Sequence, residues 1–233
     1  RFVRAQARVK PYPAGLPISF VYGGRKYRGL EEALFHLSIR RDEIDSRMTR
    51  TAITGRLADG LEVRVECTVY RDYPVEWYAE FTHRGAENSA ILEQVRLVDE
   101  VYEGASPVLL HSNGDTVDYD GYQLLRTPVG ADGIALRPLR GNPSDGAFPF
   151  MRLMTEGGGY NFAVGWPGGW LGDLDAAEGG TRVRFGQESL RAYLKPGETL
   201  RAPRVLVLTY DGDEADGRKQ WRDFYRDHVL IRE

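Results

Sequence analysis

The feature that most constrains the fold is a strict alternation of apolar and polar residues in the middle of the chain. From Leu61 to Tyr70, apolar residues occupy every second position, and the residues between them carry charges or a hydroxyl. The same alternation runs from Val75 to Thr82. Successive side chains of a strand point to opposite faces, so both segments are predicted to be strands with one buried face. The turn-forming residues 72–74 between them predict an antiparallel hairpin.

Further short strands are predicted on both sides of this hairpin. Upstream, Asp59 and Gly60 form a hairpin turn signal that joins Thr49–Leu57 to the strand starting at Leu61. The other predicted strands are Ile91–Tyr102, Tyr160–Trp166, Thr181–Phe185, Ser189–Leu194 and Val205–Thr209. Short strands separated by Gly and Pro turns are typical of an antiparallel sandwich or barrel, so we expect an all-β fold.

One amphipathic helix is predicted near the C-terminal end. Trp221, Phe224 and Tyr225 follow the i, i+3, i+4 spacing of one helix face, and His228 extends that face by one turn. Either Asp213 or Asp216 is expected to cap the start of the helix.

Between Pro107 and Phe150 the sequence is rich in Gly, Asp, Asn and Pro and has little periodicity. This stretch is predicted to form long loops, which in a β scaffold either carry ligand contacts or cover the ends of the sandwich.

Composition excludes several functional classes. The chain has 233 residues, of which 42% are hydrophobic, and this length is sufficient to bury a core. With 31 basic and 34 acidic residues the chain lacks the net positive charge that would attract nucleic acid. No apolar run approaches the roughly 18 residues of a membrane span.

The single cysteine excludes a disulfide framework and a cysteine-based zinc site. Because Cys67 falls on the apolar side of its strand, we expect a buried, unreactive thiol. The four histidines show no metal-ligand spacing, so neither a metal nor another cofactor is expected.

Two groups of residues are candidates for chemistry. Trp166 and Trp170 flank a Pro-Gly-Gly turn, and an indole face there could accept the apolar face of a sugar. Trp166 is in phase with the buried face of its strand, so Trp170, beyond the turn, is expected to be the exposed one. The carboxylates Asp115, Asp118 and Asp120 could provide an acid–base pair, but solvated loop carboxylates are far commoner.

The sequence resembles the N-terminal β-supersandwich domain of glycoside hydrolase family 36, the α-galactosidase family. The resemblance extends over nearly the whole chain and keeps the family's order. Its segments are 61–64, 69–77, 90–93, 110–114, 148–150, 163–170, 194–198, 201–206 and 221–225. Residues 167–169 depart from it, with Pro167 and Gly169 where Ser and Gln are more usual.

This resemblance implies a galactose-mutarotase-like antiparallel β-supersandwich, with one C-terminal helix leading toward a (β/α)₈ barrel missing from this chain. In the family, both catalytic Asp residues lie on that barrel, so no catalytic residue is carried over. The implied sugar contacts at the pocket rim are His111, Asn113, Asp115 and Trp170. The expected partners are the barrel of the same parent chain and an α-galactoside or related sugar, without nucleic acid or membrane; a homo-oligomer is a further expectation.

The leading hypothesis is therefore a non-catalytic domain of a retaining α-galactosidase-like hydrolase. Residues 1–212 would form the sandwich, and residues 213–233 the helix and the start of a linker. The chain begins at Arg1 without Met or a leader, so we expect a piece of a longer, cytoplasmic protein. Two alternatives remain: a free-standing carbohydrate-binding or scaffolding module, and a small complete enzyme that uses Asp115 with Asp118 or Asp120.

Overall fold

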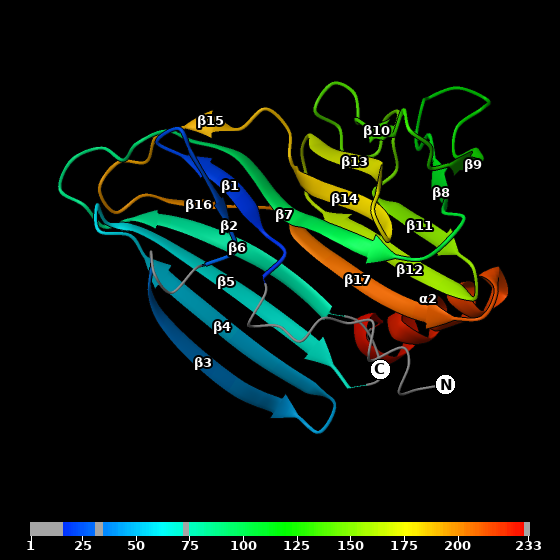
Figure 1. The fold of residues 1–233 in the computed structure, drawn as a ribbon, viewed down its shortest axis with the longest axis horizontal. Coiled ribbons are helices and arrows are strands. Elements are labelled where there is room, and N and C mark those ends of the chain that lie inside the picture. The colour runs from blue at the N-terminus through cyan, green and yellow to red at the C-terminus, as the bar shows by residue number, and fades with distance from the viewer. Residues whose placement is uncertain (1–15, 31–34, 72–74, 231–233) are drawn as a thin grey trace.

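The computed structural model describes residues 16–30, 35–71 and 75–230 as two antiparallel β-sheets packed face to face (Figure 1). The smaller sheet has seven strands in the order β10-β13-β14-β7-β1-β2, with β15 paired to β7. Its strands are β1 (Ser19–Tyr22), β2 (Arg25–Arg28), β7 (Leu92–Glu103), β10 (Ile134–Leu136), β13 (Trp170–Ala177), β14 (Gly180–Gln187) and β15 (Arg191–Ala192). The expected all-β antiparallel sandwich is thereby confirmed.

The larger sheet has ten strands in the order β3-β4-β5-β6-β17-β12-β11-β8-β9, with β16 paired to β6. Its strands are β3 (His36–Asp45), β4 (Met48–Arg56), β5 (Leu61–Tyr70), β6 (Val75–His83), β8 (Val108–Ser112), β9 (Leu124–Pro128), β11 (Phe150–Thr155), β12 (Gly158–Gly165), β16 (Thr199–Arg201) and β17 (Arg204–Asp211). Both predicted hairpin pairings, β4 with β5 and β5 with β6, are present. The turn expected at 72–74 lies outside the described residues.

The core forms where the alternating apolar faces of the two sheets meet. Leu61, Val63 and Val65 of β5 are fully buried, as their period-two spacing predicts. Trp77 of β6 joins the sheets directly, because its indole Nε1 donates a 2.6 Å hydrogen bond to the carbonyl of Leu97 in β7. The sandwich is therefore held by apolar packing and by a buried polar tie between its layers.

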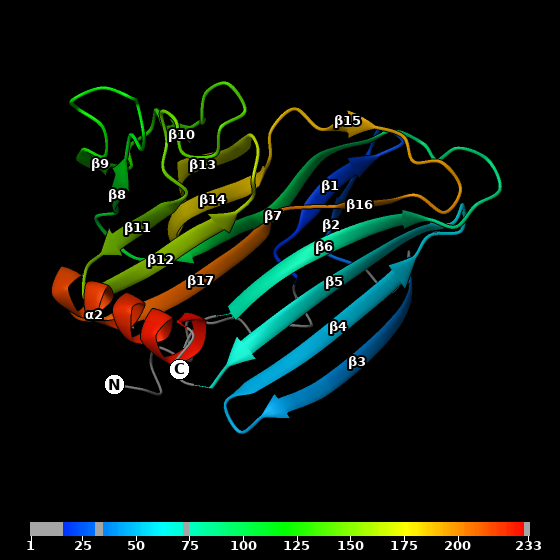
Figure 2. The ribbon, with the colours of Figure 1, turned by 180° about the vertical axis from the view of Figure 1, so that it is seen from behind.

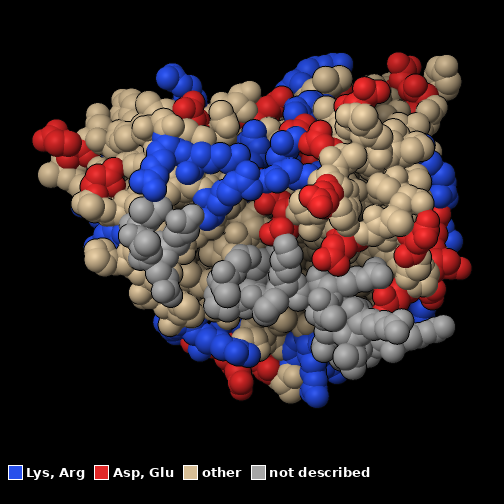
Figure 3. Space-filling model, in the orientation of Figure 1, with Lys and Arg blue, Asp and Glu red and all other residues tan. Residues whose placement is uncertain are grey.

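The outer face of the smaller sheet is charged, and Figure 3 shows Lys and Arg side chains gathered in a band over it. Asp99 of β7 is one of the charged residues of this sheet. It accepts hydrogen bonds from Ser19 Oγ at 2.7 Å and Arg182 Nη2 at 2.5 Å, and lies 3.9 Å from Lys26 Nζ. Burial alone would raise the pKa of the Asp99 carboxyl, but these hydrogen bonds and charges bring it below its usual value.

Helix α2 (Glu214–Phe224) lies on the outer face of the larger sheet, along β12 and β17 (Figure 2). Asp213 caps it by accepting from the backbone amides of Ala215 and Asp216, while the Asp216 side chain accepts from the Asp213 amide. The expected cap is thus confirmed at Asp213, and Asp216 completes a capping box. A π-helical turn, η1 (Tyr225–Val229), continues the helix. No helix among the described residues is long and apolar enough to cross a membrane.

Two sequence-based expectations about loops are wrong. The stretch from Pro107 to Phe150 contains the strands β8, β9 and β10 in addition to its loops. These strands are three to five residues long and β9 is largely exposed, so no apolar alternation marks it in the sequence. Strand β13 was also missed, because it follows directly after the Pro-Gly-Gly turn and carries an interior glycine, Gly172.

The Cys67 thiol is buried, as expected, with 3% of the residue exposed. Burial, followed by the negative charge of Glu76, raises the pKa of this thiol to about 12. Because the thiolate is the reactive form, the folded protein is expected not to react with Ellman's reagent at mildly alkaline pH. The same protein in guanidinium chloride should release one equivalent of chromophore per chain. Rapid stoichiometric reaction of the folded protein would contradict this placement of Cys67.

Candidate functional site: an aromatic groove beside helix α2

A groove with a volume of about 310 Å³ opens on the outer face of the larger sheet, between helix α2 and the loop that follows β8. Strands β8, β11 and β12 supply its floor, and Trp221 of α2 forms one wall. The lining residues are Leu110, His111, Ser112, Tyr122, Leu124, Phe148, Phe150, Met151, Arg152, Asn161, Phe162 and Trp221. None of them is an Asp or a Glu.

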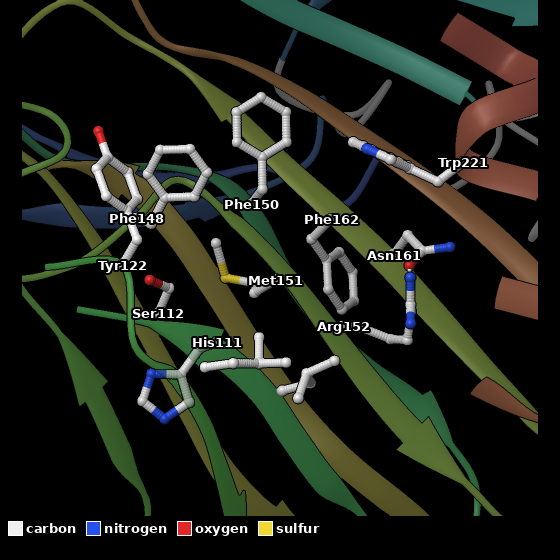
Figure 4. Close-up of a pocket in the computed structure, with 12 residues that line it drawn as sticks. His111, Ser112, Tyr122, Phe148, Phe150, Met151, Arg152, Asn161, Phe162 and Trp221 are labelled. Atoms are coloured by element: carbon white, nitrogen blue, oxygen red, sulfur yellow. Dashed lines mark hydrogen bonds between the residues drawn. The ribbon is translucent and has the colours of Figure 1, made fainter. Parts of the chain in front are cut away.

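Four rings form a continuous row along this groove, and we call Tyr122, Phe148, Phe150 and Trp221 the aromatic row (Figure 4). Successive ring centroids lie 5.6, 5.3 and 5.8 Å apart, and the first and last contacts are edge-to-face. Such contacts hold each ring in a fixed orientation. Tyr122 is nevertheless 59% exposed and Phe150 is 36% exposed, so the row presents apolar surface to solvent.

The floor of the groove ties helix α2 to the sheet through two buried polar side chains. Arg152 Nε donates a 2.6 Å hydrogen bond to Asn161 Oδ1, and Arg152 Nη1 donates to the carbonyl of Glu214 at 3.3 Å. Asn161 Nδ2 in turn donates to the carbonyl of Gly217 at 3.2 Å. Burial lowers the pKa of the Arg152 guanidinium. Because both carbonyls belong to α2, this pair fixes the helix, and with it Trp221, relative to the sheet.

Close packing at Gly217 has the same effect. A Cβ at this position would lie 2.9 Å from the ring of Tyr210 in β17, so only glycine allows the helix to approach the sheet this closely. The groove is therefore a preformed feature with a rigid wall.

His111 and Ser112, at the end of β8, line the other side of the floor. His111 Nε2 shares a 3.0 Å hydrogen bond with Thr127 Oγ1 in β9. Burial lowers the pKa of the His111 imidazole, so the ring is neutral at neutral pH. Ser112 Oγ accepts a 3.1 Å hydrogen bond from the amide of Gly114, which leaves its hydroxyl proton free to donate.

The loop 113–123 after β8 is held by its own side chains. Asn113 uses both ends of its amide, donating to the carbonyl of Asp120 at 2.8 Å and accepting from the amide of Gln123 at 2.7 Å. Asp115 Oδ1 accepts from the amide of Val117 at 3.1 Å. Val117 adopts φ +58°, which is strained for a β-branched residue, and is 89% exposed. The loop thus has a fixed shape with an apolar tip.

The carboxylates of this loop have the surroundings of solvated side chains. Asp115 and Asp118 are exposed, and Asp120 Oδ1 accepts a 3.2 Å hydrogen bond from the Thr116 hydroxyl. Within residues 16–30, 35–71 and 75–230, no group of three or more His, Cys, Asp or Glu side chains is placed to hold a metal ion.

The expectation that Trp170 is exposed is wrong. Trp170 is the first residue of β13 and is fully buried, with its Nε1 donating a 2.8 Å hydrogen bond to the carbonyl of Pro143. The next residue, Ser144, accepts from the amide of Asp115 at 2.7 Å through its carbonyl. Trp170 therefore supports the loop that carries Asp115 from beneath. Trp166 is partly exposed and packs against the core, as its phase in the strand predicts.

Of the four predicted sugar contacts, the structure places His111 on the groove, Asn113 and Asp115 on the loop beside it, and Trp170 in the core. The sequence analysis missed the aromatic row as a unit. Its signals were present in Phe148 and Phe150 around a proline and in Trp221 on the apolar stripe of the helix, but that stripe indicates a core-facing surface. Only the pairing of β8 with β11 and the seating of α2 show that these segments meet.

Sequence comparison identifies no relatives, since no protein-family model and no curated protein matches the chain. Comparison with solved structures finds chains of similar fold. The α-galactosidase AgaA of glycoside hydrolase family 36 from Geobacillus stearothermophilus matches with a TM-score of 0.68 and 18% identity, over 92% of this chain and 33% of that enzyme. Forms of AgaA have also been solved in complex with stachyose and with raffinose.

Two further α-galactosidases give the same result. The enzyme from Lactobacillus brevis matches with a TM-score of 0.72 and 16% identity, over 92% of this chain and 31% of its own. The galactosidase domain of the α-galactosidase–sucrose kinase AgaSK matches with a TM-score of 0.72 and 18% identity. The match covers 93% of this chain and 32% of that structure. At these identities the likeness concerns the fold, and this chain spans about a third of the length of each structure.

Proposed function

We propose that this chain is a non-catalytic domain of a retaining α-galactosidase-like glycoside hydrolase, packed on a catalytic (β/α)₈ barrel of the same parent protein. The observation that carries this proposal is the fold, which matches α-galactosidases over 92–93% of this chain but over only 31–33% of theirs. A domain of this kind leaves the reaction to residues elsewhere in the parent protein.

The chemistry of the groove supports the same division of labour. Retaining glycoside hydrolysis requires two carboxyl groups about 5–5.5 Å apart, one as nucleophile and one as acid and base. The residues that line the groove include no carboxylate, and the nearby loop carboxylates Asp115 and Asp118 are exposed. The described lining of the groove thus lacks the carboxyl pair that this reaction uses.

In this proposal the loop 113–123 contributes to the rim of the sugar pocket, with His111, Asn113 and Asp115 as the residues nearest the substrate. The internal hydrogen bonds of the loop support this role, because a rim residue must keep its position without a ligand. Trp170 acts indirectly, by holding the backbone on which the loop rests. A cytoplasmic location and a homo-oligomeric state stay predictions.

The test compares two proteins on a chromogenic α-galactoside. The 233-residue chain alone is expected to give no hydrolysis above the buffer rate, whereas the product of the whole parent gene should hydrolyse the substrate. Hydrolysis by the purified 233-residue chain, lost on replacing Asp115, Asp118 or Asp120 by Asn, would instead establish a small complete enzyme. An inactive whole-gene product would contradict the hydrolase assignment.

A further inference from the structure

We propose that the groove beside helix α2 is a binding site for a pyranose sugar. The aromatic row would carry the apolar face of the sugar, and the floor of β8, β11 and β12 would bind its hydroxyls. This site does not depend on the hydrolase proposal, because every residue that forms it belongs to this chain.

The aromatic row has the properties of a sugar platform. Its rings are partly exposed and are fixed by ring contacts with centroids 5.3–5.8 Å apart, two of them edge-to-face and one tilted, so little conformational freedom would be lost on binding. Trp221, the largest of them, is further held by the ties between α2 and the sheet. An exposed apolar surface that is this ordered is typical of a recognition site.

The floor supplies polar atoms directly beside these rings. The Ser112 hydroxyl can still donate, since the one hydrogen bond it makes to Gly114 uses only its oxygen as acceptor. Arg152 donates from Nε to Asn161 Oδ1 and from Nη1 to the carbonyl of Glu214. Its Nη2 makes no hydrogen bond to any described residue. A ligand with an apolar face and several hydroxyls satisfies both sides of the groove at once, whereas a purely apolar ligand would leave the polar floor unsatisfied.

The charged residues near the groove and the volume of the groove bear on which ligand it can bind. Arg152 is the one charged residue among the lining side chains. Nearby, Arg126 and Arg218 each pair with Glu214 at 2.5 Å, so this group keeps a net positive charge. The Nη2 of Arg152 can donate to a sugar hydroxyl, a contact that does not require a negative charge on the ligand. A volume of about 310 Å³ lies at the lower end of ligand sites and suits one or two sugar rings.

Titration of the 233-residue chain with galactose, melibiose, raffinose and galacturonate tests this site, using calorimetry and amide chemical-shift mapping. We expect millimolar binding of these sugars, with shifts centred on the aromatic row and Ser112. Tyr122→Ala, at a 59% exposed position, should weaken binding about three- to tenfold without affecting the fold. Trp221→Ala should abolish measurable binding.

Tyr193→Ala provides the matched control, because Tyr193 is 48% exposed and does not line the groove; its affinity should equal that of the parent chain. The proposal is overturned if none of the four sugars produces heat or groove-centred shifts, or if binding is unchanged in both Tyr122→Ala and Trp221→Ala. Because the Tyr122 variant leaves helix α2 intact, a folding defect in the Trp221 variant cannot obscure the result.

Discussion

Replacing Trp170 by alanine is expected to lower the free energy of unfolding by about 3–5 kcal/mol, the range for truncating a fully buried large aromatic side chain. Trp170 is 0% exposed, and its Nε1 bonds the carbonyl of Pro143, which would lose its partner. The backbone beside that carbonyl supports Asp115, so the loop 113–123 should also become more mobile. Urea denaturation and amide hydrogen exchange measure these two effects.

Trp166→Ala is the matched control, because Trp166 lies at the other end of the same turn and is only partly buried. Its loss of stability should be clearly smaller. If Trp170→Ala costs less than about 1 kcal/mol, the indole does not occupy the core position described here.

Replacing Arg152 by methionine is expected to loosen helix α2 from the sheet. The change keeps the apolar volume of the side chain but leaves Asn161 Oδ1 and the Glu214 carbonyl without their donor. Each buried polar group left unsatisfied costs about 1–3 kcal/mol. The measurement is hydrogen exchange of the amides in 214–224 together with the fluorescence of Trp221, which should both report a more open helix.

Arg218→Met separates this effect from the loss of a positive charge. Arg218 pairs with Glu214 at 2.5 Å on the same helix but is 58% exposed, so its removal should change stability by no more than about 0.5 kcal/mol. Equal exchange rates in the two variants would show that Arg152 does not hold the helix.

The parts of the fold that were predictable are those in which local pattern and tertiary burial agree. Strands β5 and β6 alternate cleanly because one face meets the core and the other meets solvent. The cap at Asp213 was equally visible, because a helix N-terminus is satisfied by residues a few positions away. Strand β9 carries no such pattern, because it lies at the edge of its sheet and is largely exposed.

The site was less predictable, because its residues come together only through long-range pairing. Trp170 follows a turn that would expose it in an isolated hairpin, yet pairing of β13 with β14 places the indole in the core. Trp221 has the spacing of a core-facing helix residue, yet α2 covers only part of the sheet and leaves that ring at the edge of the groove. The structure thus buries Trp170, which the sequence predicted to be exposed, and leaves Trp221 half-buried in the wall of the groove.

If these 233 residues are one domain of a larger hydrolase, as we propose, the natural gene product is much longer than this chain. The most direct test is the intact mass of the natural gene product, with peptide mapping across Glu233. The account predicts a protein of about three times the 26.3 kDa of this chain, since the chain covers 31–33% of the α-galactosidases it matches, with peptides continuing beyond Glu233 into a (β/α)₈ barrel. A natural product of 26.3 kDa that ends at Glu233 would contradict it.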